Sequence, residues 1–123
     1  MDLRANARHT FHRLDDLRRA ARALPPDQQR RIQAAWLAAY RKASAIQRKT
    51  KPLERGDVLA VIDQCARCIR AARAERLPDE DTEFAEAALR RLRTEADRVW
   101  PPPPPTPVED QPRSPTMRLR YKR

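Results

Sequence analysis

The chain has 123 residues with one glycine and 12 prolines, and 27 basic residues against 17 acidic ones give a net charge of +10. This length fits one domain, and the shortage of β-branched and aromatic residues excludes a β-rich protein, because strands depend on those residue types. Ala and Arg, both good helix formers, predominate, so the composition predicts an all-α protein with a thin core.

The first predicted helix runs from about Asp2 to Leu24. Its apolar and small residues recur at alternating steps of three and four, which places them on one face: Leu3, Ala7, Thr10, Leu14, Leu17, Ala21 and Leu24. Pro25 and Pro26 end this helix and open the next, because proline disfavours helix in the residue before it but is accepted in a first turn. The second helix is predicted to extend to about Lys49 and to pack antiparallel to the first.

A break over residues 50–57 precedes the third predicted helix, which starts with Asp57 as its N-cap and ends near Arg76. Its apolar face is the widest in the chain, so we expect this helix to be the most buried. One stripe is Leu59, Ile62, Ala66, Ile69 and Ala72, and beside it lie Val58, Val61, Cys65 and Cys68. Residues 43–61 have the order of a helix-turn-helix, although the eight-residue break is long for that motif's turn.

The fourth predicted helix runs from Asp79 to Trp100, with acidic residues in its first turn that complement the helix dipole. Its inward-facing residues are predicted to be Phe84, Ala85, Ala88, Leu89, Leu92, Ala96 and Val99. The expected fold is a small bundle of about four helices over residues 1–100. Residues 101–123 hold eight of the 12 prolines and end in a basic segment. We expect this tail to be extended and disordered, because it cannot form a packed core.

The charge is unevenly distributed along the chain. Residues 1–56 carry 14 basic and five acidic side chains, a net +9, whereas residues 57–100 carry eight and ten, a net −2, and the tail carries five and two, a net +3. Such a basic half indicates binding to a polyanion, and guanidinium groups suit phosphate. The candidate nucleic-acid-binding residues are Arg4, Arg8, Arg18, Arg22, Arg30, Arg31, Arg41, Lys42, Arg48, Lys49, Lys51 and Arg55.

Two aromatic residues of the second helix are candidates for contact with bases. Trp36 lies on the apolar stripe of this helix, which is favourable for a place in the core or at an interface. The stripe consists of Ile32, Ala35, Trp36, Ala39, Ala43 and Ile46. Tyr40 lies beside that stripe at the basic end of the helix, which makes it the better candidate for stacking. With so few aromatic residues, contact with the nucleic-acid backbone is expected to outweigh readout of bases.

The chain's histidines and cysteines form two pairs with the same spacing, His9 with His12 and Cys65 with Cys68. On helices this spacing puts each pair on one side, so two crossing helices would offer Zn²⁺ two nitrogens and two sulfurs. The alternative is that the cysteines are small apolar residues of the core, since they continue the stripe of Val58 and Val61. Our interpretation is the second, so no metal and no cofactor are expected.

No phosphate-binding glycine loop and no catalytic triad or carboxylate pair is evident, so we do not expect an enzyme. The leading hypothesis is a nucleic-acid-binding accessory subunit that contacts RNA or DNA backbone within a larger nucleoprotein complex. At the level of architecture alone, a small basic helical bundle resembles the small subunits of CRISPR effector complexes and the DNA-handling accessory proteins of phages and plasmids.

The alternatives are a helical adaptor or inhibitor that docks an acidic protein, and a zinc-stapled bundle. Apolar helical faces would serve protein partners or self-association in either case. No apolar leader or membrane-spanning run is seen, and the two cysteines make no disulfide framework, so we expect a cytoplasmic protein without membrane contact.

Overall fold

The computed structural model describes residues 2–102. They form α1 (Leu3–Ala20), a short 3₁₀ turn η1 (Ala21–Ala23), α2 (Pro26–Arg48), α3 (Arg55–Ala74) and α4 (Asp79–Val99). This range contains no strand, which confirms the predicted all-α fold with four helices. Residues 103–123 lie outside the described residues, and with them most of the predicted disordered tail.

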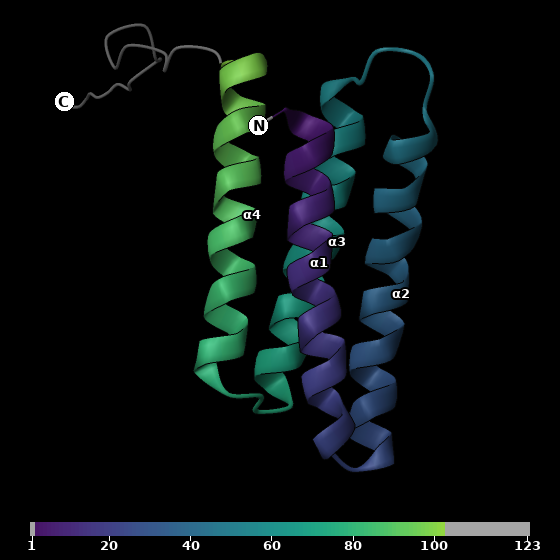
Figure 1. Cartoon of the computed structure of the whole chain (residues 1–123), viewed down its shortest axis with the longest axis vertical. Helices are drawn as coiled ribbons and strands as arrows, with labels where there is room; N and C mark the ends of the chain where they lie inside the picture. Colours follow the sequence, from purple (N-terminus) through teal and green to yellow (C-terminus); the bar gives the residue numbers. More distant parts are fainter. Residues whose placement is uncertain (1, 103–123) are drawn as a thin grey trace, which may run out of the picture.

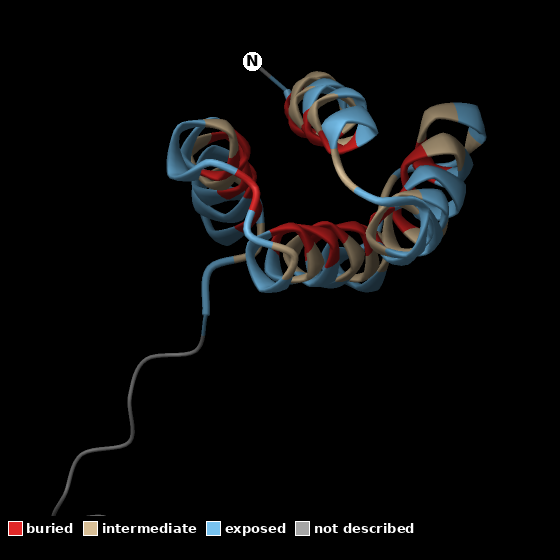
Figure 2. Cartoon of the chain, turned by 90° about the horizontal axis from the view of Figure 1, so that it is seen from below, coloured by how far each residue is buried: buried red, intermediate tan, exposed pale blue. Residues whose placement is uncertain are grey.

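The helices run alternately down and up and pack into one bundle (Figure 1). α1 and α3 lie in the middle and contact each other, while α2 and α4 flank them on opposite sides (Figures 1 and 2). α2 therefore packs against α1 and α3, and its C-terminal half lies beside the N-terminal half of α1. α2 and α3 pack along their length in opposite directions, which differs from the crossed helices of a helix-turn-helix.

Local hydrogen bonds explain where the first two helices begin and end. The Asp2 carboxylate accepts a hydrogen bond from the Ala5 N–H at 2.7 Å and so caps α1. α1 ends four residues before the predicted Leu24, because η1 tightens the last turn and Leu24 is extended ahead of Pro25. Pro26 opens α2 with Asp27 in its first turn, as the sequence predicts.

The predicted N-cap of α3, Asp57, is wrong by three residues. Glu54 is the N-cap, and Asp57 is the third residue of the helix in a reciprocal capping box. The Glu54 N–H donates to the Asp57 carboxylate at 2.8 Å, and the Glu54 side chain accepts from the Asp57 backbone in return. The connector between α2 and α3 is correspondingly shorter than the sequence predicts.

The C-terminus of α3 is closed by a Schellman motif. The Leu77 N–H donates to the Ala72 carbonyl at 3.1 Å, and the Arg76 N–H donates to the Arg73 carbonyl at 3.0 Å. Arg76 takes the left-handed conformation that this motif requires, with φ of 65°, and Leu77 is buried beyond it. The turn fixes the approach of α4 to α3.

The core lies between the four helices, and the buried residues face this shared interior (Figure 2). α3 contributes the most buried residues of the described helices, as predicted. Its buried face is centred on Val58, Val61, Cys65 and Cys68, whereas Leu59 is 42% exposed. The inward placement predicted for Phe84 and Val99 is also wrong, since these side chains are 53% and 41% exposed.

Candidate functional site

Three aromatic rings meet at the seam between α1 and α2. Phe11 of α1 lies 5.4 Å from Trp36 and 5.6 Å from Tyr40, measured between ring centroids. Trp36 and Tyr40 stack on each other with their centroids 5.4 Å apart and an angle of 17° between planes. Trp36 is half-buried, in keeping with its predicted place in the core or at an interface, and Tyr40 is 44% exposed.

A pocket of 210 Å³ opens beside this aromatic cluster. Its lining combines two aromatic rings, two guanidinium groups and small or polar residues from both helices: Arg8, Phe11, Tyr40, Ala43, Ser44, Gln47 and Arg48. Arg8 donates a hydrogen bond to the Gln47 amide oxygen at 3.3 Å across the seam. The pocket thus offers a flat apolar surface, amide and hydroxyl groups, and positive charge within one small volume.

Arg18 lies at the other side of the aromatic cluster. Its guanidinium carbon is 4.3 Å from the centroid of the Trp36 ring, a cation–π arrangement. Arg18 also donates to the Asp15 carboxylate at 2.8 Å. Burial raises the pKa of Asp15, but hydrogen bonds from Arg18 and Arg19 outweigh it and hold that pKa below its usual value. Trp36 Nε1 is buried and has no hydrogen-bond partner among the described residues.

Several of the predicted phosphate-binding residues are engaged within the fold. Arg4 donates to the carbonyl oxygens of Ile46 and Lys49 at 3.1 and 2.8 Å, and so covers the C-terminal end of α2. Four others form ion pairs: Arg18 with Asp15, Arg30 with Asp27, Arg31 with Glu75, and Lys49 with Asp57. The Arg31 pair has two hydrogen bonds, of 2.9 and 3.0 Å, and it lowers the pKa of Glu75.

The remaining predicted residues have no ion-pair partner within residues 2–102. One of them, Arg22, is exposed in η1 at the far end of α1. The other six are exposed on segments that lie toward the same end of the bundle, namely the N-terminal half of α1, the C-terminal half of α2, the connector and the start of α3 (Figure 1). We call them the cationic end: Arg8, Arg41, Lys42, Arg48, Lys51 and Arg55. Phosphate can approach these groups without first displacing a carboxylate of the described chain.

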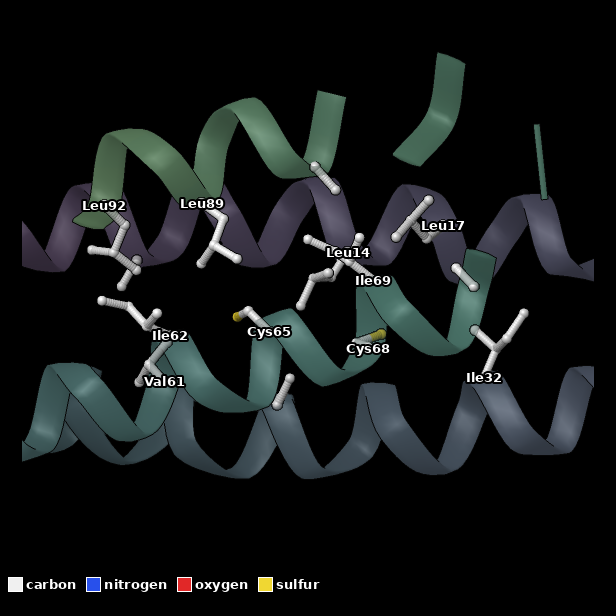
Figure 3. Close-up of a cluster of buried hydrophobic side chains, with 14 of the residues drawn as sticks. Leu14, Leu17, Ile32, Val61, Ile62, Cys65, Cys68, Ile69, Leu89 and Leu92 are labelled. Carbon is white, nitrogen blue, oxygen red and sulfur yellow. The ribbon is translucent and has the colours of Figure 1, made fainter. Parts of the chain in front are cut away.

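The structure places the two cysteines in the core. Cys65 and Cys68 are fully buried free thiols among the aliphatic side chains of α1, α3 and α4 (Figure 3). Burial raises the pKa of each to about 12, with the neighbouring Cys68 adding to the effect on Cys65. His12 is exposed and His9 half-buried on α1. No group of three or more histidine, cysteine or acidic side chains suited to a metal ion occurs in the described part of the chain.

The sequence pattern did not reveal the part that Phe11, Ser44 and Gln47 play in the site. Phe11 widens the apolar stripe of α1, which is the only local sign that it borders Trp36 and Tyr40. Arg13 lies 5.3 Å from the ring of the exposed Phe84, a contact between α1 and α4 on another face of the bundle. These contacts depend on which helices are neighbours, and the sequence alone does not give that order.

Comparisons of the chain with protein-family models, curated proteins and solved structures find no significant match. Among residues 2–102, no helix has both the length and the apolar character needed to cross a bilayer.

Proposed function

We propose that this protein is a non-enzymatic nucleic-acid-binding accessory subunit that contacts the phosphate backbone within a larger nucleoprotein complex. The observation that carries the proposal is the cationic end, a set of six exposed basic side chains without ion-pair partners in the described chain. Two of them, Arg8 and Arg48, line the same pocket as the exposed Tyr40. Neutralised phosphates release bound counterions, so this surface provides affinity that is independent of sequence and sensitive to salt.

The predicted basic residues differ in how available they are for the proposed contact. Arg4 and Arg31 are held by carbonyl or carboxylate oxygens of the fold, so a phosphate would compete with those partners. Arg41 and Arg48 lie seven residues apart on α2, close to one face of the helix, and are free of such competition. The connector residue Lys51 and the first residue of α3, Arg55, extend the same positive region.

Charge reversal with a matched control tests the proposal. The R41E/R48E variant removes two members of the cationic end, and R70E/R91E makes the same change of charge at exposed, unpaired positions of α3 and α4. We expect the first variant to weaken binding of labelled DNA and RNA by at least about tenfold and the second to have a much smaller effect. Equal losses in both variants would show that net charge alone, and not this surface, governs binding.

A second candidate function is an adaptor or inhibitor that docks an acidic protein. Leu37 is exposed one turn before Tyr40 on α2 and supplies an apolar contact that phosphate binding does not require. Purification from cells distinguishes the two functions. Co-purified nucleic acid supports the first, whereas a stoichiometric protein partner that remains after nuclease treatment supports the second.

A further inference from the structure

The exposed Tyr40 adds to the cationic end a feature that backbone contact alone does not need. Its ring is held in place by Trp36, which stacks on it, and by Phe11, which packs at an angle of 49°. A ring fixed in this way loses little conformational freedom when a flat ligand packs against it. Yet 44% of Tyr40 stays exposed, although the other two rings of the cluster are half-buried.

The neighbouring pocket has the composition that an unpaired base requires. The rings of Phe11 and Tyr40 offer apolar surface, while the Ser44 hydroxyl can donate or accept a hydrogen bond. The Gln47 amide in the same lining accepts from Arg8 and donates to the Arg4 carbonyl. Arg8 and Arg48 line the same small pocket, so their side chains lie close to both rings. A nucleotide has this same combination of a flat base and a charged phosphate.

From these observations, and given the proposed function, we propose that the pocket at the α1–α2 seam receives an unpaired base of single-stranded nucleic acid. The base stacks on Tyr40, and the flanking phosphates contact Arg8, Arg41 and Arg48. In a duplex the bases are stacked on each other and turned inward, so they do not reach Tyr40. Every base has a flat face, so the preference is for single strands over duplexes and not for a particular sequence.

Binding of four labelled ligands tests this inference: an oligothymidylate, an abasic strand of the same length, the corresponding duplex, and oligouridylate as the RNA counterpart. We expect the two single strands with bases to bind more tightly than the abasic strand and the duplex. The Y40L variant, which keeps apolar bulk but loses the ring, should weaken binding to oligothymidylate by about fivefold or more. It should leave binding to the abasic strand unchanged.

Two further variants control for general disruption of the surface. Y40F keeps the ring and should retain the affinity for oligothymidylate, whereas L37A alters an exposed apolar neighbour on the same helix and should have no effect. In a W100F background Trp36 is the only tryptophan of the chain. Its fluorescence should be quenched by oligothymidylate and not by the abasic strand, because Trp36 stacks on Tyr40.

The results separate this inference from the proposed function. If all four ligands bind equally well and Y40L binds like the wild type, stacking on Tyr40 is excluded while phosphate binding stands. If none of the ligands binds at low salt, the proposed function fails and the inference fails with it. A melting curve for Y40L close to that of the wild type shows that lost affinity is not lost structure.

Discussion

Arg4 of α1 donates a hydrogen bond of 2.8 Å to the carbonyl oxygen of Lys49, the residue that follows the last turn of α2. The same guanidinium reaches the Ile46 carbonyl at 3.1 Å. The final carbonyls of a helix have no partner within it, so Arg4 satisfies groups that would otherwise depend on water. One residue of the basic half thus serves the fold and joins α1 to α2.

This role predicts that R4A destabilises the protein by about 1–3 kcal/mol, the range for hydrogen bonds to a charged group. R4K keeps the charge but not the planar fork, and should recover only part of the loss. R22A, at an exposed position whose side chain has no ion pair in the described chain, is the control. Urea denaturation measures all three. A wild-type unfolding free energy in R4A would mean that Arg4 is available for phosphate.

The left-handed conformation of Arg76 predicts a stabilising substitution. A residue with a Cβ atom is sterically strained at a φ of 65°, whereas glycine is not. R76G should therefore raise the unfolding free energy by up to about 1 kcal/mol, since part of the relief is lost to the greater freedom of glycine in the unfolded chain. Thermal unfolding measures the change, and a clear destabilisation would argue against the Schellman motif.

The buried thiols predict a loss of stability at alkaline pH. Cys65 and Cys68 have pKa values raised from 9.0 to about 12, so the folded state keeps them protonated while the unfolded state ionises. The contribution of the protonated thiols to the unfolding free energy is complete below pH 9.0 and is lost as the pH rises toward about 12. C65A/C68A should lose less stability over this interval than the wild type. An equal alkaline loss in both proteins would contradict the burial of the thiols.

The lowered pKa of Asp57 predicts a loss of stability at acid pH. The hydrogen bond from Lys49, followed by that from the Glu54 backbone, holds its pKa below the usual 3.8. The stability that this interaction adds is complete above pH 3.8, the usual pKa, and is lost as the pH falls through the lowered pKa. The difference in unfolding free energy between wild type and D57N should shrink as the solution is acidified. A difference that stays constant down to the acid transition would rule out this role.

Much of the fold could be predicted from the sequence, because the spacing of apolar residues along a helix is a local property. The ends of the helices were harder to predict. Glu54 and Asp57 are both acidic and three residues apart, so either can be taken as the cap until the backbone is known. Phe84 adjoins the buried stripe of Ala85, Leu89 and Leu92, and the pattern alone does not show that it falls outside.

The candidate site could be predicted only in outline. The charge of the first 56 residues predicts a basic surface on that half of the molecule, and Tyr40 stands out beside the apolar stripe of the second helix. The partners of Arg4 and Arg31 are 42–45 and 44 residues away in sequence, a separation that no local pattern bridges. For these two arginines, only the packing of α1 and α3 against α2 shows that they are engaged, whereas Arg18 and Arg30 pair with acids three residues away on their own helices.

The most direct test of phosphate binding by the cationic end is the affinity for a labelled single strand across a salt series, for wild type and R41E/R48E. Contact with about six phosphates predicts a plot of log affinity against log salt concentration with a slope of about −4. The slope should be shallower by about one or more in the variant, since two contacts are lost. A wild-type slope near zero, or the same slope in both proteins, would contradict the account.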